Sequence, residues 1–278
     1  MNSCRRSGLS PIGRNRVSFK DGTEIAYTRV GSGASLILVD GALCHRAMGP
    51  NTKLASHLSS EFTVFTYDRR GRGESGDRAP YGVEREIEDL QAVIDAAGGS
   101  ACVYGISSGG ALALEAANRL SSIERLALYE LPYVVDDTRP PIPANWAGQL
   151  AEMAATDQRA DAVRYFLRDC VGVPRPVVAM MRFMPAWPKL KAVAHTLPYD
   201  ARIIGDLGRG APLPAERWSN VTAPTLVVAG GKSPAWMQSS MRALADVLPA
   251  AEYRSLAGQT HMVKPRRLAP VLTGFFKG

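Results

Sequence analysis

The chain has 278 residues, of which 46% are hydrophobic and 21% charged, with a formal net charge of +7. This balance is typical of a soluble globular protein with one large domain, with or without an inserted subdomain. No apolar run reaches the length of about 20 residues that a membrane-spanning helix needs, so we expect no membrane partner.

The positive charge is concentrated near the start of the chain, where four arginines precede the first acidic residue, Asp21. We expect residues 1–14 to form a basic, flexible tail. Because no basic stripe interleaved with aromatic residues follows, no nucleic-acid partner is expected. The arginines are followed by no apolar segment of the signal-peptide kind, and the four cysteines form no C-x-x-C pair. These patterns favour a cytoplasmic protein without a bound metal.

The first half of the chain alternates short apolar segments with segments of helical periodicity. Residues 16–33 predict a hairpin that turns at Asp21-Gly22, because Asp-Gly is a strong turn signal between two strands. The continuous apolar run at 35–41 predicts a buried strand, and a polar helical stretch follows it. Further along the chain we expect strands at 62–68, 101–106 and 123–130, and helices at 83–99 and 108–120.

Residues 132–217 interrupt this alternation, because they are rich in Pro, Met, Trp and helical patterns and contain no convincing strand. We interpret them as an inserted helical lid. Strands at 224–231 and 251–258 and helices at 234–248 and 266–276 then resume the pattern. Alternating strands and helices predict an α/β fold, a mostly parallel sheet flanked by helices, with its opening strands as an antiparallel edge. Residues 15–131 and 218–278 would form the core.

A candidate nucleophile lies between the strand at 101–106 and the next helix. Gly105-Ile106-Ser107-Ser108-Gly109 fits the pattern G-x-S-x-G. At a strand-to-helix junction this pattern is typical of a nucleophile elbow, whose sharp turn exposes the serine. The amide of Ser108 would then point from a helix N-terminus, where negative charge is favoured, and supply half of an oxyanion hole. The alternative is that both serines only cap the helix.

Three further motifs occur in the order expected for one fold family. They are "VDGA" at 39–42, "YDRRGRGESG" at 67–76 and "GQTHMV" at 258–263. Together with the elbow, they resemble the α/β-hydrolase fold family over nearly the whole chain. The resemblance implies that the amide of Ala42 is the second oxyanion donor and that Asp40 stands where the family usually has a histidine. We also expect Asp68 and Arg70 to pair beside the elbow.

The base and the acid are expected from two other strand ends. His261 follows the last strand, so it would lie at the carboxyl edge and could take the proton of Ser107. The family usually carries its acid after the strand at 224–231, where this chain has no carboxylate. Glu130, at the end of the strand at 123–130, is therefore the expected acid. Asp136 and Asp137 are the alternatives, and a purely structural role for Glu130 also stays open.

The expected pocket is lined by Asp40 and His45 near the oxyanion turn, with an apolar roof of Trp146, Met181 and Trp187 from the insertion. We expect a serine hydrolase that cleaves a small or medium apolar ester, lactone or thioester through an acyl-enzyme, without cofactor or metal. Carbon–carbon bond hydrolysis and acyl transfer fit the same resemblance. The alternative outside the enzymes is a ligand-binding or receptor-like protein with little turnover.

Overall fold

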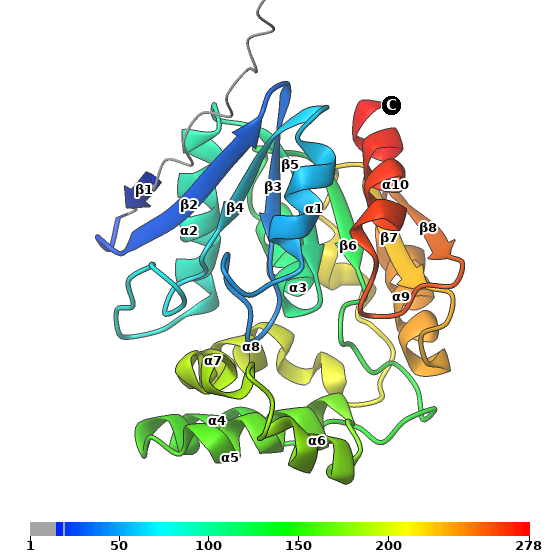
Figure 1. Ribbon diagram of the computed structural model, residues 1–278. Helices are drawn as coiled ribbons and strands as arrows, with labels where there is room; N and C mark the ends of the chain where they lie inside the picture. The colour runs from blue at the N-terminus through cyan, green and yellow to red at the C-terminus, as the bar shows by residue number, and fades with distance from the viewer. Residues whose placement is uncertain (1–14, 19) are drawn as a thin grey trace, which may run out of the picture.

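A mixed sheet forms the centre of the computed structural model, which describes residues 15–18 and 20–278; the predicted tail at 1–14 lies outside the described residues. The strand order is β1-β2-β4-β3-β5-β6-β7-β8 (Figure 1). The strands are β1 Asn15–Ser18, β2 Glu24–Gly31, β3 Ala34–Val39, β4 Phe62–Tyr67, β5 Ala101–Ile106, β6 Ile123–Tyr129, β7 Thr225–Gly230 and β8 Ala251–Leu256. β2 pairs antiparallel with β1 and β4, whereas the other neighbouring strands are parallel. The predicted sheet with an antiparallel edge is therefore confirmed.

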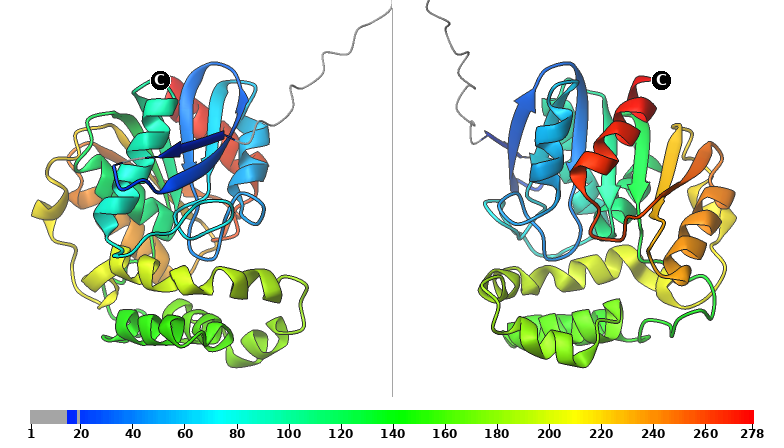
Figure 2. Two further views of the ribbon diagram at one scale, coloured as in Figure 1. Left: turned by 90° about the vertical axis from the view of Figure 1, so that its left-hand side faces the viewer. Right: turned by 45° about the vertical axis from the view of Figure 1, so that its right-hand side comes forward.

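Helices cover both faces of this sheet (Figures 1 and 2). One face carries α2 Val83–Ala96, α3 Ser108–Ala117 and α9 Ala235–Val247, and the other carries α1 Asn51–Leu58 and α10 Pro265–Lys277. The helices turn apolar stripes to the sheet: in α2, Ile87, Leu90 and Ile94 are all buried, at the spacing of one helical face. Each face thus has its own apolar core, and the sheet separates the two.

The strand order brings distant segments to one edge of the sheet. β5 lies between β3 and β6, and all three are parallel, so their carboxyl ends meet at the same edge. The segments that follow them start at Asp40, Ser107 and Glu130. In open α/β sheets, ligands bind at this edge, where connections leave toward opposite faces.

A set of helices lies against that edge (Figures 1 and 2). We call residues 146–218 the helical layer. Its elements are α4 Trp146–Ala155, α5 Arg159–Tyr165, the π-helix η1 Phe166–Val171, α6 Arg175–Met181, α7 Trp187–Ala192, α8 Leu197–Ile204 and the 3₁₀ turns η2 Ala194–Thr196, η3 Gly205–Gly208 and η4 Ala215–Trp218. Between β6 and β7 the described chain contains no strand, as predicted.

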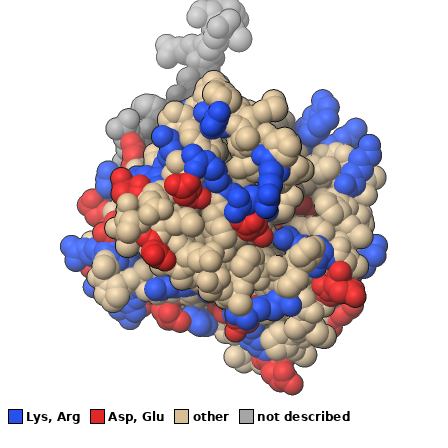
Figure 3. Space-filling model, turned by 90° about the horizontal axis from the view of Figure 1, so that it is seen from below, with Lys and Arg blue, Asp and Glu red and all other residues tan. Residues whose placement is uncertain are grey.

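The outer surface of the helical layer is chemically mixed. Acidic and basic side chains lie interspersed around uncharged areas on this side of the molecule (Figure 3). α6 packs against η1, and the large apolar side chains exposed around it are Val171, Val177, Met180, Phe183 and Met184. No helix within the described ranges is long and apolar enough to cross a membrane.

Candidate active site

Ser107 stands on a sharp turn between β5 and α3, with φ 56° and ψ −132°. This backbone conformation is strained for a residue with a side chain, and such strain is typical of a nucleophile elbow. The turn also needs close backbone approach. A Cβ at Gly105 would lie 2.5 Å from the Cα of Gly110, and one at Gly109 would lie 2.4 Å from the carbonyl oxygen of Asp40. Gly105 and Gly109 are therefore required, because the backbone around Ser107 leaves no room for a side chain at either position.

Glu130 is fully buried at the end of β6, and its carboxylate meets the imidazole of His261. The Oε2 atom lies 2.9 Å from Nδ1 of His261. The Oε1 atom accepts hydrogen bonds from the amide of Gly230, at 2.7 Å, and from the hydroxyl of Ser233. Both carboxylate oxygens are thus held in place, and the imidazole is fixed through Nδ1, which leaves Nε2 for another partner.

A cavity of about 660 Å³ lies between the sheet edge and the helical layer. Ser107, His261 and Glu130 all contribute to its wall, although no hydrogen bond joins Ser107 to His261. Asp136 and Asp137, the alternative acids, do not line it. Within the described part of the chain, no three His, Cys, Asp or Glu side chains gather as metal ligands would.

Two residues predicted to line the pocket lie elsewhere in the loop after β3. Asp40 is only 2% exposed and sits under Gly49, where an added Cβ would lie 2.8 Å from its Oδ2. Burial raises the pKa of Asp40 to about 7. His45 pairs with Met48 in a short bridge and does not reach the cavity. Neither residue lines the cavity as predicted, because Asp40 is buried beneath the loop and the backbone of His45 is held in the short bridge to Met48.

Two predicted roof residues of the helical layer are not among the residues that line the cavity. Trp187 is buried among the apolar side chains of the layer, and Met181 packs against the same core. Trp146, at the start of α4, does line the cavity. The apolar character of these residues is evident from the sequence, but the helix face that meets the cavity depends on packing.

The predicted oxyanion donors flank Ser107. Ala42 and Ser108 both line the cavity, and neither amide donates a hydrogen bond within the described residues. The loop lies directly against the nucleophile, because a Cβ at Gly41 would be 3.5 Å from Oγ of Ser107. The Nη1 atom of Arg72 donates a hydrogen bond of 2.8 Å to the carbonyl oxygen of Gly41. Since a trans peptide directs its N–H opposite to its carbonyl, this bond sets the direction of the Ala42 amide.

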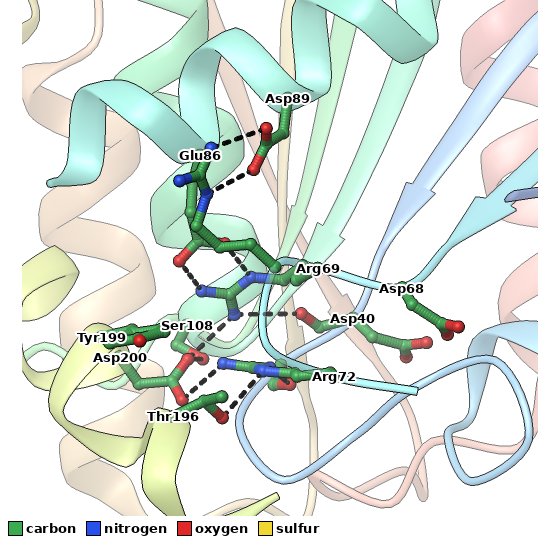
Figure 4. A network of polar contacts seen from close by, with 12 residues as sticks. Asp40, Asp68, Arg69, Arg72, Glu86, Asp89, Ser108, Thr196, Tyr199 and Asp200 are labelled. Carbon is green, nitrogen blue, oxygen red and sulfur yellow. Dashed lines mark hydrogen bonds and ion pairs between the residues drawn. The ribbon is translucent and has the colours of Figure 1, made fainter. Parts of the chain in front are cut away.

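A buried carboxylate that sequence reasoning missed ties this loop to the helical layer (Figure 4). Asp200 of α8 is 1% exposed and accepts hydrogen bonds from Arg72 at 2.8 Å, from Arg69 at 2.9 Å and from the Ser108 hydroxyl at 2.8 Å. Burial raises its pKa, but the two guanidinium groups and the hydroxyl outweigh that effect and leave the pKa below its usual range. Glu86 of α2 balances Arg69 with two further hydrogen bonds.

A neighbouring ion pair also differs from expectation. Arg70 pairs with Asp89 and Asp21. Asp68 instead binds the amide and the guanidinium of Arg46. The predicted pair of Asp68 and Arg70 is therefore wrong: each of the two braces the loop after β4 from a different side.

We expect Asp200→Ala to lower the free energy of unfolding by about 3–5 kcal/mol, because it leaves the buried guanidinium of Arg72 without a carboxylate partner and removes one of the two partners of Arg69. Urea denaturation followed by circular dichroism measures the change. The matched control is Asp206→Ala, since the carboxylate of Asp206 is 87% exposed in its pair with Arg209 and should contribute less than about 1 kcal/mol. Equal effects of the two substitutions would contradict a special contribution from the buried cluster.

Comparison with known proteins agrees with this architecture. The family model described as "Alpha/beta hydrolase family" matches residues 31–271. An alpha/beta hydrolase from Sphaerobacter thermophilus DSM 20745 is 51% identical, with a TM-score of 0.87, and the match covers 94% of this chain and 100% of that one.

Two more distant structures share the fold. One is an enol-lactonase from Burkholderia xenovorans LB400, 23% identical, with a TM-score of 0.66 and coverage of 95% of this chain and 100% of its own. The other is a thermophilic esterase from Thermogutta terrifontis, 21% identical, with a TM-score of 0.65 and coverage of 95% and 98%. Among curated proteins, none matches. The match over residues 31–271 and the relative at 51% identity show that the chain belongs to the alpha/beta hydrolase family.

Proposed function

We propose that the protein is a serine hydrolase that cleaves a small or medium ester, lactone or thioester through an acyl-enzyme. The observation that carries the proposal is the buried carboxylate of Glu130 on Nδ1 of His261, with Ser107 on the wall of the same cavity. A nucleophile, a base and an oriented acid are the three groups that this chemistry needs.

In the first half of the reaction, Oγ of Ser107 attacks the carbonyl carbon of the substrate while Nε2 of His261 takes the hydroxyl proton. The imidazolium formed is stabilised by the carboxylate of Glu130, and it returns the proton to the departing alcohol or thiol. In the second half, the same imidazole deprotonates a water molecule that attacks the acyl carbon and releases the acid and Ser107. The hydrogen bond from Ser107 to His261 is required to form as substrate binds, since such contacts commonly tighten in the complex.

The negative oxygen of the tetrahedral intermediate would be bound by the amides of Ala42 and Ser108. Both line the cavity and both are free of other partners among the described residues, so they are available without rearrangement. A single donor of this kind is worth about 10²–10³ in rate. Two structures of the same fold are named an enol-lactonase and an esterase, and the substrates proposed here are of the classes that these names denote.

Reaction with a fluorophosphonate probe tests the proposal, because the probe forms a stable adduct only with an activated serine. We expect one label per chain, placed on Ser107 by mass spectrometry of the digested protein. A well-folded protein that resists the probe and hydrolyses no p-nitrophenyl ester would contradict the proposal. That outcome would favour a ligand-binding protein on a hydrolase scaffold.

A further inference from the structure

An arginine of the cavity is held by groups that leave its charge uncompensated. Arg139 follows β6 and lines the cavity that holds Ser107. Its Nε donates to the carbonyl oxygen of Pro140 and its Nη2 to that of Cys170, both at 3.1 Å. The guanidinium lies 4.6 Å from the ring centroid of Trp236, which also lines the cavity. The side chain is therefore fixed in place, and three of its five N–H donors stay available.

No carboxylate neutralises this guanidinium. The ion pairs of the described residues include none with Arg139, and residues 1–14 and 19 contain no Asp or Glu. Desolvation lowers the pKa of Arg139, as expected for a cation that burial separates from water without a counter-charge.

The other ionisable groups on the cavity wall have hydrogen-bond or ion-pair partners of their own. Arg168 pairs with its neighbour Asp169. Glu130 is bound to His261, and Asp200 is bound by buried arginines. Of the two arginines on the wall, Arg139 is thus the one without a carboxylate partner among the described residues. A fixed, partly desolvated guanidinium with free donors matches the planar, bidentate geometry of a carboxylate.

We propose that Arg139 binds a carboxylate of the substrate, so that the preferred substrates are esters or lactones that carry a second, ionised carboxyl group. This inference rests on the proposed function, since it names the substrate class of the same cavity. It changes the expected substrate from a purely apolar acyl compound to one with an anionic end. Trp146, Phe166 and Ile204, which also line the cavity, would contact the carbon chain between the two ends.

The test compares two p-nitrophenyl esters of equal chain length, the neutral hexanoate and the anionic half-ester of adipic acid, with longer half-esters to find the best spacing. For Arg139→Gln we expect kcat/KM on the preferred half-ester to fall about tenfold to a hundredfold, mainly through KM. Hydrolysis of the hexanoate should stay within about twofold. Arg139→Lys should restore part of the lost preference, because it returns the charge without the planar fork.

The matched control is the double variant Arg168→Gln, Asp169→Asn, which removes an ion pair from the same wall without changing its net charge. It should leave the preference for half-esters intact. If Arg139→Gln slows both esters equally, or if no half-ester is preferred over the hexanoate, the carboxylate site is disproved.

Calorimetric titration with adipate separates this inference from the proposed function. We expect adipate to bind the wild-type protein and to bind Arg139→Gln at least tenfold more weakly. If the protein hydrolyses no ester but adipate binding depends on Arg139, the hydrolase proposal fails and the carboxylate site stands. If esters are hydrolysed and adipate binds neither protein, the hydrolase proposal stands and the carboxylate site is disproved.

Discussion

Replacing Ser107 by alanine is expected to lower kcat for p-nitrophenyl esters by about 10⁶-fold, the loss found when a serine nucleophile is removed from a triad. No neighbouring group can substitute for it, because the elbow presents only this side chain at the junction of β5 and α3. Steady-state and single-turnover kinetics measure the loss, and labelling by the fluorophosphonate probe should disappear with it. The fold should persist, since alanine removes only the hydroxyl from the strained position.

Ser108→Ala is the matched control for this prediction. The two serines are adjacent, but the hydroxyl of Ser108 is committed to Asp200 and only its amide serves the proposed reaction. We expect about 1–3 kcal/mol less stability, for one lost hydrogen bond to a buried charge, and no more than about a tenfold loss in kcat. If Ser108→Ala abolished labelling while Ser107→Ala did not, the assignment of the nucleophile would be reversed.

Glu130→Gln is expected to lower kcat by about 10⁴-fold with little change in KM, because the amide cannot stabilise the imidazolium and favours the wrong orientation of the ring. The side chain is isosteric, and its oxygen can still accept the hydrogen bonds from Gly230 and Ser233. Circular dichroism and urea denaturation should therefore report a folded protein. Kinetics with p-nitrophenyl esters and the probe's labelling rate should fall together.

Asp136→Asn serves as the control, because the carboxylate of Asp136 binds Thr138 and does not line the cavity. Its kcat should stay within about twofold of the wild-type value. A loss in Asp136→Asn or Asp137→Asn with full activity in Glu130→Gln would place the acid at the entry to the helical layer.

The sheet and the meeting of Ser107, Glu130 and His261 could be predicted because both follow from strand ends. Apolar runs identify strands, and parallel strands bring the residues that follow them to one edge. A carboxylate after β6 and a histidine after β8 are therefore expected to lie close together, although no carboxylate follows β7 directly. Only the order of the elements is needed for this expectation, and the packing of the side chains is not.

The helical layer was predictable as helices but not in its contacts. Asp200 was missed because its partners, Arg69 and Arg72, are about 130 residues away in the chain, and nothing local to α8 indicates a buried charge. Met181 and Trp187 were misplaced because an apolar residue on a short helix can face either the cavity or the neighbouring helices. The only signal of buried charges in the sequence is the arginine-rich loop at 67–76, because buried guanidinium groups need carboxylate partners from other segments.

The hydrogen bonds of Asp200 also fasten the α8 half of the helical layer to the sheet, whereas the α6 half is held more loosely. Moving α8 away from the sheet would separate the carboxylate of Asp200 from Arg69 and Arg72 and leave Arg72 without a carboxylate partner, so this half cannot swing outward at low energy. α6 makes its closest contacts with η1, which lines the cavity, and it leaves Val177 and Met180 exposed. Reactants and products are therefore expected to pass on the α6 side, while the loop after β3, which Arg72 holds beneath α8, keeps its shape through every turnover.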